Sequence, residues 1–93
     1  MKDDPPTPAQ AGTVHIQLFA AAKEAAGGRQ WITLQLCEPA DAAETLRQVG
    51  VQVPELAPLT KRSRLAVNDR YVSDETPIHV GMELALIPPV SGG

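Results

Sequence analysis

Alternation of apolar and polar residues is the feature that most constrains the fold of this chain. Residues 13–19 and 30–36 each place three aliphatic side chains on one face and mainly polar side chains on the other. A period of two residues is that of a half-buried β-strand, because successive strand side chains point to opposite sides of the sheet. Gly27 and Gly28 end the short segment between the two strands and favour a hairpin-like return. The sequence therefore predicts a sheet that buries one of its faces.

Helical signals are fewer. Residues 20–26 (AAAKEAA) are strong helix formers. Residues 41–44 (DAAE) have the form of a capping box that opens a second helix, and Gly50 is expected to end that helix. A tight turn is expected at Asn68-Asp69-Arg70. Further short strands are expected at 65–67, 71–72 and 83–87. This order of elements favours an α+β domain.

Length limits the core. A chain of 93 residues buries only about 60 to 65% of the surface that its unfolded form exposes, which leaves one modest core. Pro54 and Pro58 exclude a long helix between residues 51 and 63, where Leu56 and Leu59 are placed to pack beneath the sheet. The predicted core consists of apolar residues at inward strand positions: Val14, Ile16, Ile32, Leu34, Val67, Leu84 and Leu86.

Composition excludes several classes of function. With a net charge of -3 and three aromatic residues, the chain has neither the basic field nor the stacking platform that nucleic acid requires. The lone Cys37 cannot form an internal disulfide, so a reducing compartment and a cytoplasmic location are expected. No apolar run approaches the roughly 18 residues of a membrane span. The two histidines stand far apart, and neither a metal site nor a bound cofactor is expected.

The last six residues, Pro88-Pro89-Val90-Ser91-Gly92-Gly93, combine stiffness with an absence of bulk. Proline fixes φ and lacks an N–H donor, so the preceding strand cannot continue as a paired central strand. Six extended residues reach roughly 20 Å, and two final glycines leave the terminal carboxylate without neighbouring side chains. The carboxylate of Gly93 is therefore the candidate reactive group, although many chains simply end in frayed small residues.

Three parts follow from these patterns. Residues 1–12 carry acids and prolines without hydrophobic periodicity, which is typical of a flexible tail that cannot repay its ordering entropy. Residues 13–87 form the folded domain. Residues 88–93 form the extended C-terminal tail.

The run from Val67 to Gly93, VNDRYVSDETPIHVGMELALIPPVSGG, resembles the C-terminal signature of the small, sulfur-carrier subunits of molybdopterin synthase. That family belongs to the ubiquitin-like β-grasp superfamily of sulfur carriers, and PPVSGG is the most specific element. Upstream, VHIQLFAAAKEAAGG resembles the family's first strand and helix, and ADAAETLRQVG its second helix. Met82 and Asp69 depart from the family pattern. The resemblance implies a β-grasp fold, with a mixed sheet of four to five strands packed on one main helix and a protruding tail.

The resemblance also implies a mechanism. Gly93 would be adenylated by a ubiquitin-activating-like adenylyltransferase that uses ATP, and a sulfur donor protein would convert it to a thiocarboxylate. The tail, from Pro88 through Gly92, would insert into a channel of the large catalytic subunit. There the sulfur would pass to a cyclic pterin precursor and build the molybdopterin dithiolene. The chain would then be a sulfur-donating subunit, not an enzyme by itself, within a heterotetramer of two large and two small subunits.

Some residues suit a partner interface. Phe19, Trp31 and Tyr71 could form a docking patch for a large subunit, and Trp31 is the foremost candidate because it lies on the strand face opposite the predicted core. Lys61, Arg62 and Arg64 form a basic cluster that suits an ion-pair contact with an acidic partner surface. The plainer interpretation is that the aromatic residues close the edge of a small core and that the basic residues lie in a solvated loop.

Three other functions remain open at this point. A sulfur carrier for thiazole, cysteine or transfer-RNA thiolation would share the tail chemistry. A ubiquitin-like protein modifier would form an isopeptide bond through Gly93 instead of donating sulfur. An inert interaction domain would have a tail that no activating enzyme touches.

Overall fold

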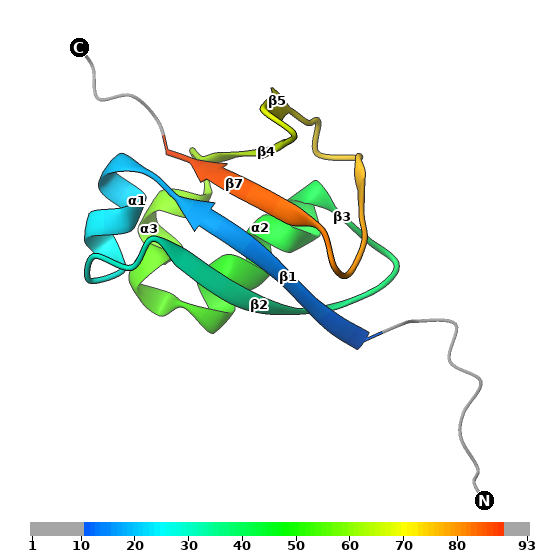
Figure 1. Ribbon diagram of the computed structural model, residues 1–93, viewed down its shortest axis with the longest axis horizontal. Coiled ribbons are helices and arrows are strands. Elements are labelled where there is room, and N and C mark those ends of the chain that lie inside the picture. Colours follow the sequence, from blue (N-terminus) through cyan, green and yellow to red (C-terminus); the bar gives the residue numbers. More distant parts are fainter. Residues whose placement is uncertain (1–10, 89–93) are drawn as a thin grey trace, which may run out of the picture.

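The chain folds around a five-stranded mixed sheet whose strand order is β2-β1-β7-β4-β5 (Figure 1). The computed structural model describes residues 11–88. The sheet contains β1 (Ala11–Leu18), β2 (Trp31–Cys37), β4 (Arg64–Val67), β5 (Arg70–Tyr71) and β7 (Glu83–Ile87). β1 runs antiparallel to β2 and parallel to β7, and β4 runs antiparallel to both β7 and β5. The first and last strands of the chain are thus neighbours in the middle of the sheet.

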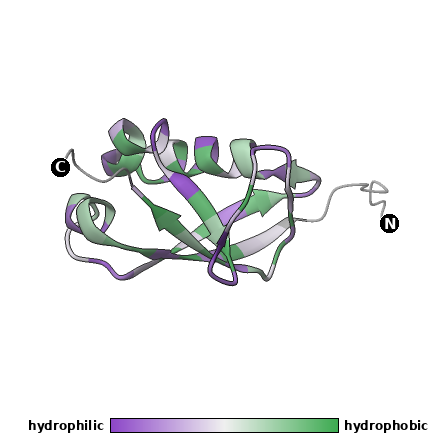
Figure 2. Cartoon of the chain, turned by 90° about the horizontal axis from the view of Figure 1, so that it is seen from above, coloured by the Kyte–Doolittle hydropathy of each residue, from purple (hydrophilic) through white to green (hydrophobic). Residues whose placement is uncertain are grey.

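The helices lie mainly on one side of this sheet. They are α1 (Ala20–Ala25), α2 (Ala42–Gln52), the 3-10 turn η1 (Pro54–Leu56) and α3 (Ala57–Thr60). α2 and α3 gather behind the sheet in Figure 1, and Figure 2 shows the same layering from above. The longest helix, α2, is the main helix on the sheet, so the predicted α+β class with a mixed sheet on one main helix is confirmed.

Side chains from both layers form one core. Leu56 is fully buried, as its predicted place beneath the sheet requires, and Leu59 packs against the core while partly exposed. The predicted core residues are buried, except that Val67 is only partly so. The largest fully buried side chains are Ile16, Leu18, Leu34, Leu56, Leu65, Ile78 and Leu86.

The opening of α2 follows the predicted signal, but its end does not. Asp41 Oδ1 accepts a hydrogen bond of 2.8 Å from the Glu44 N–H, as an N-cap should. The expected end at Gly50 was wrong, because the helix continues to Gln52. Gly50 lies within the helix and faces α3, where a Cβ would make ordinary contact at 3.4 Å from the Ala57 Cα. The helix ends before Pro54, which restricts the preceding residue to extended geometry.

Two other connections show what the sequence did and did not reveal. Asn68 and Asp69 have φ values of 53° and 66°, so the predicted tight turn between β4 and β5 is confirmed. A small second sheet of β3 (Ala40–Asp41) and β6 (Pro77–Ile78) was not foreseen.

The start of β1 also differs from the expected boundary. The strand begins at Ala11, which pairs with Cys37, whereas residues 11 and 12 were assigned to a tail. Gly12 lies against the segment before β7, and a Cβ at this position would lie only 2.9 Å from the Val80 Cβ. A glycine is therefore required here for close approach between β1 and the loop.

Candidate functional site

The chain reaches its C-terminal segment from the middle of the sheet. Leu86 is fully buried and pairs with Leu18 on one side and with Leu65 on the other. Pro88 is also buried, although the sequence placed it in an extended tail. The last described residue is therefore packed against the domain. The tail residues predicted to carry the chemistry lie outside the described residues: Pro89, Val90, Ser91, Gly92 and Gly93.

The face of the sheet turned away from α2 and α3 is called here the outer face. The strand register aligns one residue from each of the five strands side by side across this face. We call this set the central row: Trp31, Gln17, Ala85, Ala66 and Tyr71. Trp31 and Tyr71 are 45% and 57% exposed at the two ends of the row. The predicted position of Trp31, opposite the core, is confirmed by the alternating burial of β2.

A second row lies beside the end of β7. Ile87 pairs with Arg64, whose guanidinium carbon lies 4.6 Å from the centre of the Tyr71 ring. Phe19 follows Leu18 in extended geometry, which carries the parallel register with β7 one residue further and places Phe19 beside Ile87. Phe19 is 40% exposed. An aromatic, an aliphatic and a cationic side chain therefore lie next to the point where β7 ends.

Three of the four predicted interface residues thus share the outer face: Phe19, Trp31 and Arg64. Arg62 does not lie on a strand of that face. It is exposed in the connection between α3 and β4, where its N–H donates to the Leu59 carbonyl. The outer face thus combines exposed aromatic side chains with a cation placed over one of their rings.

Sequence reasoning missed part of this surface. Ile87, Ala85 and Ala66 were not singled out, although they lie between the aromatic residues on this face. The alternation in β7 contained one usable signal, because Ala85 and Ile87 are apolar at positions opposite the buried Leu84 and Leu86. Tyr71 is one of the aromatic residues that the sequence offers for docking, but only the pairing of β5 with β4 brings it into the row.

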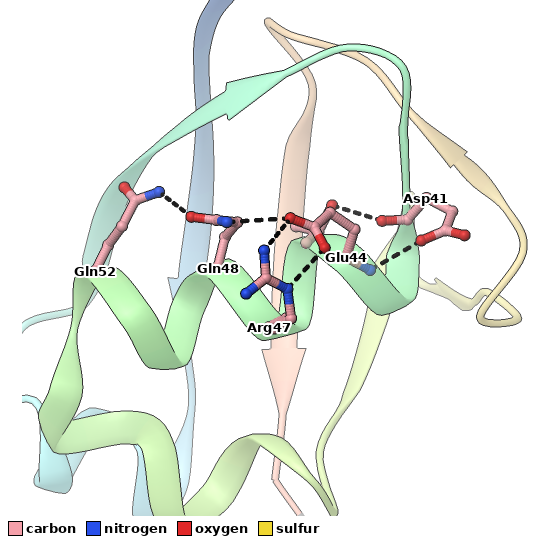
Figure 3. A network of polar contacts seen from close by, with 6 residues as sticks. Asp41, Glu44, Arg47, Gln48 and Gln52 are labelled. Atoms are coloured by element: carbon pink, nitrogen blue, oxygen red, sulfur yellow. Dashed lines mark hydrogen bonds and ion pairs between the residues drawn. The ribbon is translucent and has the colours of Figure 1, made fainter.

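The group with the largest shift in pKa stabilises α2. Two hydrogen bonds of 2.8 Å from Arg47, with a further one of 3.0 Å from Gln48, lower the pKa of Glu44 to about 2. Gln48 in turn accepts from Gln52 at 2.8 Å, and the chain of contacts runs along the helix in Figure 3. The Gln52 side chain then accepts from the Gln35 N–H at 2.9 Å and donates to the Gln35 carbonyl at 2.8 Å. This network ties α2 to β2.

A second carboxylate, that of Glu38, lies at the end of the sheet where β2 ends and β7 begins. Glu38 accepts 2.6 Å and 3.1 Å contacts from the Val80 N–H and from His79 Nδ1. The backbone hydrogen bond from Val80, followed by the contact with His79, lowers the pKa of Glu38. Since Glu38 follows β2, which runs antiparallel to β1, it lies far from the end of β7. Its role here is to connect two loops.

A metal site, a membrane-spanning helix and a pocket are the other features to consider in the described residues. Residues 11–88 contain no group of three or more His, Cys, Asp or Glu side chains arranged for a metal ion. None of their helices is long and apolar enough to cross a membrane. A hollow of about 550 Å³ lies between α2 and α3 with Leu46, Val51 and Ala57 in its lining. It faces away from the outer face.

A mixed sheet with parallel β1 and β7 at its centre, crossed by one main helix, defines a ubiquitin-like β-grasp protein. Residues 16–93 match the ThiS family, and the chain belongs to that family.

Named relatives and a solved structure agree with this assignment. The chain is 31% identical over 80 residues to the molybdopterin synthase sulfur carrier subunit of Arabidopsis thaliana, which covers 86% of this chain and 82% of that protein. It is 37% identical over 81 residues to the subunit of the same name from Dictyostelium discoideum, covering 84% and 93%. The crystal structure of SAMP1 from Haloferax volcanii superposes with a TM-score of 0.73 at 26% identity, covering 88% and 100%.

Proposed function

We propose that this protein is a sulfur carrier and serves as the small subunit of molybdopterin synthase. The observation that carries the proposal is that the family match extends to residue 93, so it includes the terminal Gly-Gly. Curated relatives that carry the name of this subunit cover most of the chain. The fold adds a physical argument, because the chain reaches its tail from a central strand beside an exposed apolar face.

The proposed reaction uses the chain terminus and no side chain. The Gly93 carboxylate attacks the α-phosphate of ATP on an activating adenylyltransferase, and pyrophosphate leaves. Sulfur at the oxidation level of sulfide, delivered by a donor protein, then attacks the acyl carbon and displaces AMP, which leaves a thiocarboxylate, because an acyl adenylate is a far better acyl donor than a carboxylate. In the large catalytic subunit this nucleophilic sulfur passes to the cyclic pterin precursor and contributes to the molybdopterin dithiolene.

The division of labour follows from what the described domain provides. Its outer face supplies a docking surface of Phe19, Trp31, Ile87, Arg64 and Tyr71. Docking there turns delivery of the tail into an intramolecular step at high effective concentration. The partner provides base, pocket and substrate binding, and ATP belongs to the activating partner. The chain itself then binds no cofactor and is not an enzyme alone.

A second candidate function is modification of other proteins. SAMP1 from Haloferax volcanii is a small archaeal modifier protein, and its structural similarity to this chain favours such a function. In that case the activated Gly93 carbonyl would be attacked by a lysine amine to form an isopeptide bond. The same activated terminus serves both chemistries, so the nucleophile that reaches it decides the outcome.

Intact mass spectrometry tests the proposal. The full chain is incubated with its activating enzyme, ATP and a sulfur donor, and a mass gain equal to one sulfur replacing one oxygen is expected. Mixing with the large subunit and the pterin precursor should reverse the gain as molybdopterin forms. A chain lacking Gly93 is the control and should show no gain. No gain in the full chain with a demonstrably active enzyme would refute the carrier role, and lysine-linked conjugates of Gly93 would favour the modifier.

A further inference from the structure

A hollow of about 240 Å³ interrupts the outer face. Ala85 and Ala66 leave space there, because their side chains end at Cβ. Trp31 lines the hollow from β2, and Asn68 and Asp69 line it from the turn between β4 and β5. The volume is below the roughly 300 to 1,000 Å³ typical of small-molecule sites, and it suits the end of one long side chain.

The chemistry of the lining selects the charge of that side chain. Asp69 and Glu83 contribute carboxylates, while no Lys, Arg or His belongs to the lining. Within residues 11–88 neither carboxylate takes part in an ion pair. The exposed ring of Trp31 offers a π face, which attracts a cation within about 6 Å of its centroid. A cation that enters this hollow therefore meets two carboxylates and an aromatic ring.

A cation lies at the other end of the outer face. Arg64 lies beside Ile87 at the end of β7. The Glu83 end is the start of β7. On the outer face the Arg64 cation thus lies where β7 ends, the Asp69 and Glu83 carboxylates lie toward its start, and the mainly apolar central row lies between them. A partner that matches this order cannot dock in the reversed orientation without placing like charges together.

We propose that the hollow receives an arginine side chain of the protein that docks on the outer face. This rests on the proposed function only in requiring a protein partner on that face. Arginine fits better than lysine, because its planar guanidinium stacks on an aromatic ring and donates several hydrogen bonds to carboxylates at once. The bound arginine fixes the rotation of the domain on its partner, and with it the direction in which the C-terminal segment leaves.

The hollow is tested first without any partner. The isotope-labelled full chain is titrated with N-acetyl-arginine amide, and N-acetyl-citrulline amide serves as the uncharged control of the same shape. Chemical-shift changes are expected at the Trp31 indole and at Asp69 and Glu83 with the arginine compound only. They should disappear in the double variant Asp69→Asn/Glu83→Gln, in which Asn retains the left-handed turn geometry. Equal shifts with citrulline, or shifts spread over other carboxylates, would overturn the assignment.

The second measurement uses the large catalytic subunit. Asp69→Asn/Glu83→Gln should weaken binding about tenfold or more, mainly through faster dissociation. The charge-matched control Glu24→Gln/Glu75→Gln alters two exposed carboxylates outside the hollow and should change affinity less than about twofold. Equal effects of the two variants would overturn the proposal. Failure of the proposed function is distinguishable, since sulfur loading at Gly93 does not enter the arginine titration.

Discussion

Two adjacent residues of β7 allow the fold and the docking face to be perturbed separately. Leu86 and Ile87 are neighbours in sequence, but Leu86 is fully buried among the core side chains while Ile87 lies partly exposed on the outer face. Leu86→Ala should therefore destabilise the domain. Ile87→Ala should leave it nearly as stable as the parent and weaken binding of a partner on the outer face.

The magnitude follows from the position of Leu86. It pairs in register with Leu18 and Leu65, which are 1% exposed each, so the side chains around the vacated space are themselves held by neighbouring strands. Leu→Ala changes in cores cost 2 to 5 kcal/mol, and the least collapsible sites cost most. We expect about 3 to 4 kcal/mol for Leu86→Ala and about 1 kcal/mol or less for Ile87→Ala.

Urea denaturation followed by far-ultraviolet circular dichroism measures both variants. Their m values should equal that of the parent, which shows that only stability has changed. In thermal unfolding, a loss of about 3 kcal/mol corresponds to a Tm roughly 12 to 24 °C lower for a domain of this size. A cost below about 1 kcal/mol for Leu86→Ala, or equal costs for the two variants, would refute the assignment of the two faces of β7.

Three further outcomes are expected. Asp41→Ala removes the side-chain cap of α2 and should cost about 1 kcal/mol in urea unfolding, whereas Asp41→Asn should cost less because it can still accept the hydrogen bond. The Arg47 contact lowers the pKa of Glu44 from 4.5 to about 2, so its stabilisation is complete above pH 4.5 and lost as pH falls toward 2. Because the pair is exposed, this loss of stability at low pH should be small and should shrink further in high salt. Urea midpoints measured against pH should show it in the parent and not in Glu44→Gln. Gly12→Ala places a Cβ 2.9 Å from that of Val80 and should lower the free energy of unfolding by about 1 to 3 kcal/mol. Thermal unfolding measures this, and an unchanged Tm would show that the loop around Val80 moves freely and that the reasoning is wrong.

The sequence predicted those elements whose structure is determined by neighbouring residues in the chain. The alternation in residues 83–87 gave β7 with its observed bounds, because the period of two is a property of the strand itself. Asn68 and Asp69 predicted their turn because few residues accept positive φ. The pairing of β3 with β6 involves two residues from each strand and has no periodicity to read. Gly50 resembled a helix end because glycine often follows the last helical residue, but α2 continues through it to Gln52.

The candidate site divides in the same way. The outward position of Trp31 follows from the alternation along β2, whereas Arg64 was expected just before the strand at 65–67 and lies within β4. The place of both residues on one surface depends on the register across four strands. The parallel pairing of β1 with β7 brings Phe19 beside Ile87, and no local pattern specifies it. The role of Gly93 stays a prediction that the described residues do not test.

Gln52 gives the free edge of the sheet a particular character. β2 is the outermost strand on its side, and the Gln52 amide occupies the donor and acceptor of Gln35 that a strand from another molecule would otherwise use. The last turn of α2 therefore covers one of the backbone positions at which a strand from another molecule could pair with β2. The main helix thus protects part of the sheet's edge as well as covering its face.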